Sequence, residues 1–126
     1  MILERLGITT PQPLPVAAVR ADDWLAIARS AQEQWRRVNA VSRLDSQADL
    51  QGIAEQEGDG EVRRAAVRKL LDQDLLFRFA RTDPYARVRM VAASRLTRPQ
   101  DIESIGASEK NPDVLLALSN KGSADQ

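Results

Sequence analysis

Two side chains that dominate protein chemistry are missing from this sequence, which has no cysteine and no histidine among its 126 residues. Without cysteine there is no disulfide framework and no thiol chemistry, so a reducing cytoplasm is the default location. Without histidine, the commonest general base, the commonest metal ligand and the usual partner of a nucleophilic serine are absent. These absences weigh against an enzyme, and we expect no catalytic activity, no cofactor and no metal ion.

Long apolar runs and aromatic residues are also scarce. No apolar run approaches the ~18 residues that a membrane span requires, and Met1–Gly7, which contains Glu4, makes a poor signal peptide. Aromatic residues are 4% of the chain, and no run of alternating β-branched residues indicates a strand. A hydrophobic content of 43% and a charged content of 29% suit one soluble domain with a core.

The charges balance overall but are unevenly distributed. Residues 61–98, which we call the basic block, carry ten basic and four acidic side chains, whereas residues 99–126 carry two basic and five acidic ones. Fifteen of the 18 basic residues are arginine, an overall bias that we attribute to a GC-rich genome. The basic block itself is open to a second interpretation, as a surface that pairs with carboxylates or phosphates.

The chain repeats internally with a 26-residue period. Several columns of apolar residues keep the same register over most of its length, and such a period indicates stacked supersecondary units that bury their apolar faces against one another. The clearest columns are Leu44, Leu70 and Leu96; Ile27, Ile53, Phe79 and Ile105; and Trp24, Leu50, Leu76 and Ile102.

Within each unit the apolar spacing predicts two short helices. Leu50, Ile53 and Ala54 follow the i, i+3, i+4 pattern of one helical face, and Val62 and Ala66 begin a second such face. Helices of this length are marginal alone in water, so packing must hold them. We expect a helical domain over residues 16–119, preceded by an extended lead over 1–15 that contains three prolines and followed by a flexible tail over 120–126.

Turn residues mark several helix starts. Asp83-Pro84 and Asn111-Pro112 each place an N-cap residue before a proline at the first helical position. Asp72 is predicted to cap the helix that follows it. The acidic segment 55–61 has the glycine and carboxylate spacing of a calcium loop, but Ala66 stands where that loop needs a bidentate glutamate, so we interpret the segment as a turn.

Glu61–Leu70 and Arg87–Leu96 resemble the second helix of HEAT and HEAT-like repeats, which follows an Asp-Pro turn and reads Val-Arg-any-Ala-Ala. The resemblance covers residues 35–118. It implies an all-α fold of the armadillo type: a short right-handed α-solenoid of about four two-helix repeats. Two departures stand out, because Arg36 replaces the first valine of one helix and Leu115 replaces the arginine of the last unit.

The resemblance also implies a ladder between repeats, in which the arginine after the valine binds an acid of the next unit. Such a ladder is structural, since buried Arg–carboxylate pairs fix geometry. The implied arginines are Arg37, Arg63 and Arg89, and the implied acceptors are Glu57, Asp83 and Glu109.

The second helices offer the best candidate binding site. Arg64 and Arg68 are four residues apart and share one side of a helix, and Met90 and Ser94 are their equivalents in the next unit. The resemblance implies that this helix lines the concave surface. The functional interpretation is a shallow groove for an acidic or amphipathic segment of a protein; the alternative is an ordinary charged face.

The two tryptophans have different expected roles. Trp24 occupies a core column and is predicted to be buried. Trp35 lies outside the matched columns, and it either covers the position left by the missing valine at Arg36 or is an exposed anchor of the kind that interfaces favour. We favour the packing role.

The function predicted from the sequence is non-catalytic protein binding, as a scaffold, adaptor or assembly factor. One alternative is nucleic-acid binding through the basic block, against which stand the zero net charge, a pI near 6.3 and few aromatics for stacking. Another is a HEAT-like protein associated with a lyase, which no residue supports specifically. We expect a protein partner and no membrane.

Overall fold

The computed structural model describes residues 21–124, and this part of the chain is entirely helical, without a strand. The all-α prediction is therefore confirmed for these residues, whereas the predicted lead over 1–15 lies outside them. The helices are α2 (Ala21–Ser30), α3 (Gln34–Ser42), α4 (Gln47–Gln56), α5 (Gly60–Val67), α6 (Gln73–Thr82), α7 (Ala86–Ser94), α8 (Pro99–Ser108) and α9 (Pro112–Ala124).

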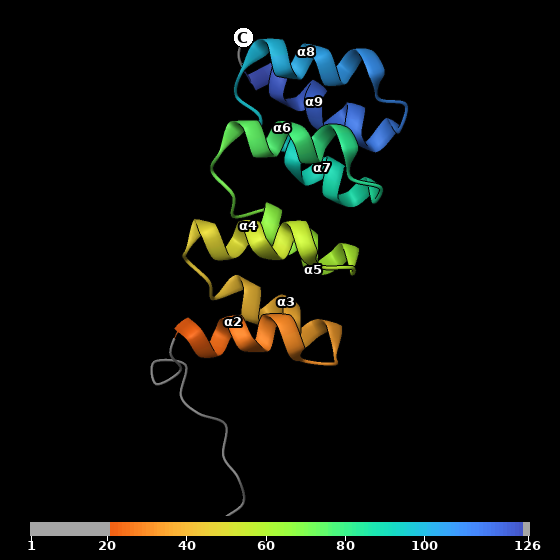
Figure 1. The fold of residues 1–126 in the computed structure, drawn as a ribbon. Coiled ribbons are helices and arrows are strands. Elements are labelled where there is room, and N and C mark those ends of the chain that lie inside the picture. The colour runs from red at the N-terminus through yellow and green to blue at the C-terminus, as the bar shows by residue number, and fades with distance from the viewer. Residues whose placement is uncertain (1–20, 125–126) are drawn as a thin grey trace, which may run out of the picture.

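The helices follow one another in pairs, α2 with α3 at one end and α8 with α9 at the other (Figure 1). The first helices of the pairs, α2, α4, α6 and α8, begin one 26-residue period apart, and so do the second helices, α3, α5, α7 and α9. We call these two sets the first-helix row and the second-helix row. The second helices contact one another in turn, and more extensively than the first helices do.

The core consists of the residues that recur at this period. Leu44, Leu70 and Leu96 follow the second helices and are at most 1% exposed. Ala66 and Ala92 are fully buried, and their small side chains let neighbouring helices of the second-helix row approach closely. The first helices contribute another buried set, which comprises Leu50, Ile53, Ala54, Leu76, Phe79 and Ala80.

Side-chain caps begin several helices where the sequence predicted them. The carboxylate of Asp72 accepts from the N–H groups of Asp74 and Leu75 at 2.8 and 3.1 Å. The amide oxygen of Asn111 accepts from the N–H of Asp113 at 2.8 Å, and α9 begins at Pro112. These caps satisfy N–H groups that lack partners in the first turn of a helix.

Two predicted boundaries differ from the structure. Asp83 ends α6 rather than beginning a helix, and α7 begins at Ala86, because the Asp83 carboxylate binds Arg63 and the N–H of Tyr85 instead of capping a helix at Pro84. At the other end, α9 continues through Ala124, beyond the start of the tail predicted over 120–126.

Within residues 21–124, no helix combines the length and apolar character needed to cross a membrane.

Candidate functional site

The exposed side of the second-helix row is where the sequence predicted a binding site. Because these helices contact in turn and begin one period apart, residues at that spacing hold equivalent places on neighbouring helices. One such set is Val38, Arg64, Met90 and Leu116. Val38 and Met90 are half-buried against the core, and Leu116 is 59% exposed. We call the surface formed by this set together with Trp35, Arg68 and Ser94 the second-helix face.

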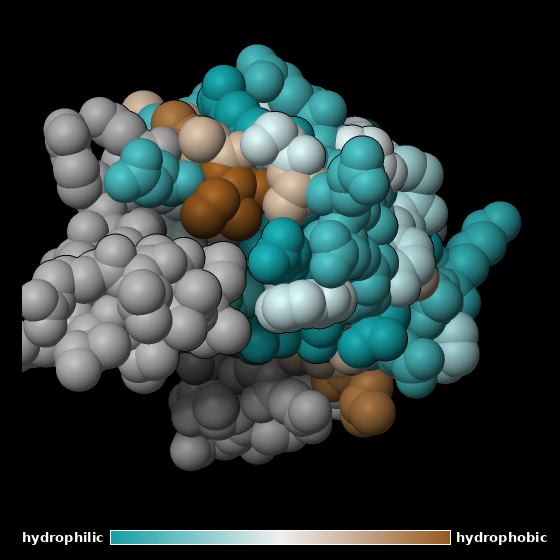
Figure 2. Space-filling model, turned by 90° about the horizontal axis from the view of Figure 1, so that it is seen from below, coloured by the Kyte–Doolittle hydropathy of each residue, from teal (hydrophilic) through white to brown (hydrophobic). Residues whose placement is uncertain are grey.

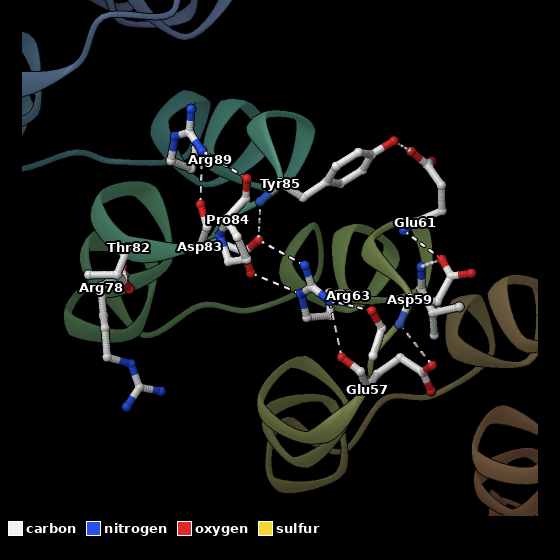
Figure 3. Close-up of polar contacts among 12 residues, drawn as sticks. Glu57, Asp59, Glu61, Arg63, Arg78, Thr82, Asp83, Pro84, Tyr85 and Arg89 are labelled. Carbon is white, nitrogen blue, oxygen red and sulfur yellow. Dashed lines mark hydrogen bonds and ion pairs between the residues drawn. The ribbon is translucent and has the colours of Figure 1, made fainter.

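Arg64 lies on this face but is not free. Its Nη1 is 3.4 Å from Oε1 of Glu61, one turn earlier on α5. The hydroxyl of Tyr85 donates to Oε2 of Glu61 at 2.5 Å (Figure 3), and Nε of Arg87 is 3.5 Å from the same oxygen. The hydrogen bond to Glu61 raises the pKa of Tyr85. Glu61 therefore neutralises part of the charge that the sequence assigned to the groove.

The other three predicted residues on α5 and α7 differ in availability. Arg68 is exposed at the C-terminal end of α5 and has no ion-pair partner within the described chain. Met90 is half-buried, and Ser94 is exposed with its hydroxyl donating to the carbonyl of Val91 at 2.7 Å. Arg68 is therefore the cation of this face that is open to a partner.

Trp35 has the exposed position rather than the packing role that the sequence favoured. Its side chain is 64% exposed, and the guanidinium of Arg36 lies 5.7 Å from its ring centroid. The packing prediction is wrong, because the Trp35 ring is exposed and the neighbouring Arg36 side chain is exposed as well, 4.0 Å from Glu33. Trp24, in contrast, packs half-buried against the core with Arg43 5.8 Å from its ring.

The implied ladder residues lie close together. Arg63 binds both oxygens of Asp83 at 3.0 Å, and its Nη1 donates to the carbonyls of Glu57 and Gly58 at 3.2 and 2.9 Å (Figure 3). Arg89 repeats this arrangement, with Nε 2.8 Å from Glu109 and Nη1 donating to the Asp83 carbonyl. Each arginine thus ties its own helix to the turn before it and to the next unit.

The first ladder position is looser. Nη2 of Arg37 lies 3.7 Å from Glu57 and 3.6 Å from Asp59, and its Nε is buried without a hydrogen-bond partner. Asp59 also caps α5 by accepting from the N–H of Glu61 at 2.8 Å, so its carboxylate is shared. Burial raises the pKa of Asp59, but hydrogen bonds from Gln34 and the backbone, with the charge of Arg37, outweigh it and leave that pKa lowered.

Most basic side chains of the basic block bind other groups of this chain. Eight of its ten basic side chains bind a carboxylate or a backbone carbonyl, and the exceptions among the described residues are Arg68 and Arg81. Polyanion binding needs cations that are free to contact phosphates. The number of these charges was evident from the sequence, and the resemblance implied partners for Arg63 and Arg89 but not for the other basic side chains of the block.

Sequence reasoning missed two further sets of contacts at the same period. Gln47 donates to the carbonyl of Lys69 and accepts from the N–H of Leu71, both at 3.0 Å, and Gln73 makes the same pair of bonds one unit later. Lys69 donates to the Ser42 carbonyl at 2.9 Å and to that of Leu44, and one unit later Arg95 donates to the Leu70 carbonyl at 2.8 Å. The periodic spacing of these side chains was the available signal.

The arrangement offers no metal-binding cluster within residues 21–124, where no three histidine, cysteine, aspartate or glutamate residues come together suitably. Seen from the α2 end, the surface is mostly hydrophilic, with hydrophobic side chains gathered in small areas (Figure 2).

Comparisons with family models, curated proteins and solved structures found no match.

Proposed function

We propose that this chain is a non-catalytic protein-binding scaffold, adaptor or assembly factor of the cytoplasm, built as a short right-handed solenoid of four HEAT-like repeats. Two observations support the architecture. Helices of each row begin at the 26-residue period, and the Arg63–Asp83 and Arg89–Glu109 pairs recur at that period. Repeat proteins of this kind bind through extended surfaces on the inner side of their curvature.

The second-helix face is the surface that carries the proposal. The second helices contact one another more extensively than the first helices do, which supports a second-helix row on the inner side of a curved stack. This face combines exposed Trp35 and Leu116 with half-buried Val38 and Met90 and with the open cation Arg68. Large exposed apolar side chains beside arginine are typical of protein interfaces.

The chemistry of this face favours an acidic or amphipathic segment of a protein. Apolar side chains of the segment would cover Met90 and Leu116, and a carboxylate would pair with Arg68. A nucleic acid would instead require many free cations, and most of the basic block is bound internally.

The experiment compares charge reversals. Arg68→Glu alone should leave the melting temperature within about 2 °C of wild type, because exposed charges contribute little to stability. Arg64→Glu combined with Arg68→Glu also breaks the Arg64–Glu61 pair, so its melting temperature is measured together with its binding. Proteins that bind wild type from a lysate should bind the double variant at least ~10-fold less, with a salt-dependent association rate. Arg81→Glu, which reverses an exposed arginine on the first-helix row, is the matched control.

Capture of the same proteins by wild type and the double variant would refute the proposal. Displacement of those proteins by random duplex DNA, increasing steeply as salt falls, would favour nucleic-acid binding instead.

A further inference from the structure

The first-helix row contains three clefts that recur at the period of the chain. They lie between α2 and α4, between α4 and α6 and between α6 and α8, with volumes of about 190, 450 and 410 Å³. They form because the first helices contact one another sparsely. Their equivalent positions hold different residues, so each cleft is a natural control for the others.

The α4–α6 cleft neutralises its own charges. Its lining contains the carboxylates of Glu55, Glu57 and Asp83 and the guanidinium groups of Arg63 and Arg78. Arg78 donates to Glu55 across the cleft, and Arg63 binds Asp83. The cation that faces this cleft from α6 is therefore already occupied.

The α6–α8 cleft has the opposite balance. Arg81 stands where the α4–α6 cleft has Glu55, and Lys110 stands where it has Pro84. The two carboxylates in the lining, Asp83 and Glu109, are bound to Arg63 and Arg89. Among the residues that the structure describes, Arg81 and Lys110 have no carboxylate partner, although they line the same cavity.

The surroundings leave the donors of these two side chains available. The guanidinium of Arg81 lies 5.9 Å from the ring centroid of Phe77, and stacking of this kind leaves the N–H edges of the guanidinium open. The hydroxyls of Thr82 and Ser108 donate to carbonyls of their own helices, at 2.8 Å to Arg78 and 3.3 Å to Ser104. The cations are thus the donors that the cleft offers to a ligand.

We propose that the α6–α8 cleft binds a doubly charged oxyanion, a phosphate group, through Arg81 and Lys110. The planar fork of arginine binds two phosphate oxygens at once, and lysine adds a point charge. A cavity of about 410 Å³ accommodates a phosphate together with several waters, each of which occupies roughly 30 Å³ in the liquid. Free phosphate and a phosphoryl group on a larger molecule share this chemistry.

The test is a titration followed by nitrogen-15 NMR, at constant ionic strength maintained with chloride. Inorganic phosphate should shift the Arg81 Nε and Lys110 amide resonances saturably. Arg81→Glu recreates the charge of the α4–α6 cleft and should raise the dissociation constant at least ~10-fold. Arg68→Glu makes the same change in net charge on the second-helix face and should leave that constant within about twofold.

A linear, non-saturating shift for wild type, or equal weakening by Arg68→Glu, would overturn the proposal. Phenyl phosphate distinguishes the two sources: binding as tight as that of inorganic phosphate indicates a phosphoryl group with an attached molecule, and much weaker binding indicates the free ion. Amide spectra that overlay away from the cleft establish that each variant is folded. The result is independent of protein capture by the second-helix face, so either proposal can fail alone.

Discussion

Arg63 binds Asp83 through two parallel hydrogen bonds of 3.0 Å, although the two residues are far apart in the chain. Their side chains are only 12% and 4% exposed. In contrast, the Arg78–Glu55 pair joins the first helices of the same two units with side chains that are 51% and 36% exposed. Both are arginine–carboxylate pairs between the same two units, but one is buried and the other is largely exposed to solvent.

Arg63→Ala should destabilise the fold by about 3–5 kcal/mol, because it leaves the Asp83 carboxylate buried without its counter-charge. Arg78→Ala should cost at most about 1 kcal/mol, as is usual for an exposed pair. Urea unfolding followed by circular dichroism measures both. Equal costs would show that burial does not determine the strength of these pairs. Any partner affinity of the folded Arg63→Ala protein should match wild type, since Arg63 is not part of the second-helix face.

Leu70 and Leu71 are adjacent in sequence and opposite in environment, at 0% and 67% exposure. Leu70→Ala should cost about 2–5 kcal/mol through lost burial and the cavity left behind. Leu71→Ala should change the unfolding free energy by less than about 0.5 kcal/mol, as surface substitutions do. Chemical denaturation of the two variants checks this, and similar midpoints would contradict the assigned core register.

Gly60 and Gly58 are a second matched pair. A Cβ at Gly60 would lie 2.5 Å from the ring of Tyr85, whereas a Cβ at Gly58 would meet nothing within 4 Å. Gly60→Ala should therefore destabilise by about 1–3 kcal/mol through overpacking. Gly58→Ala should be neutral or stabilising by up to ~1 kcal/mol, because it restricts the unfolded chain. Melting temperatures distinguish the two variants. If Tyr85→Ala restores the stability of the Gly60→Ala protein, the contact with the Tyr85 ring is the cause of the loss.

The ladder makes stability depend on acidity. Burial raises the pKa of Glu109, but hydrogen bonds from Arg89 and from the N–H groups of Asn111 and Lys110 outweigh it, so the pKa lies below its usual value of 4.5. A carboxyl whose pKa is lowered by folding stabilises the protein above its unfolded pKa, and that stabilisation is lost as pH falls through the folded pKa.

Glu109→Gln should therefore flatten the loss of stability below a pH of about 4.5. Denaturation midpoints measured between neutral pH and the acid limb would show this. Glu103→Gln, which removes an exposed carboxylate of α8, is the control. An unchanged acid limb in Glu109→Gln would mean that the Arg89 pair forms equally well without ionisation.

The sequence predicted the periodic part of the molecule well. Leu70 and Leu96 occupy the buried columns that their spacing indicated, because the same packing requirement recurs in every unit. The sequence prediction was wrong where one side chain has two competing partners. The sequence predicts that Asp83 caps a helix at Pro84, but its carboxylate binds Arg63 and the N–H of Tyr85 instead.

The candidate site was predictable only in part. Spacing placed Arg64 and Arg68 on one helical face, but nothing in the spacing showed that Glu61 pairs with Arg64 and also accepts a hydrogen bond from Tyr85. The exposure of Leu116 was not predicted, because a helical pattern of apolar residues does not distinguish an exposed member from a buried one. Pairings between side chains of neighbouring units depend on rotamers that the period does not determine.

The contacts between units have a modular consequence. The ladder arginines and the glutamines find their partners in the next unit at nearly constant sequence separation, as Gln47 and Gln73 do. Excising residues 57–82 would therefore leave Arg37 opposite Asp83 and would bring Gln47 to the carbonyl that Gln73 now holds. These contacts would persist across the cut, whereas the Arg78–Glu55 pair would be lost, so we expect removal of one 26-residue period to leave the ladder and the glutamine contacts paired.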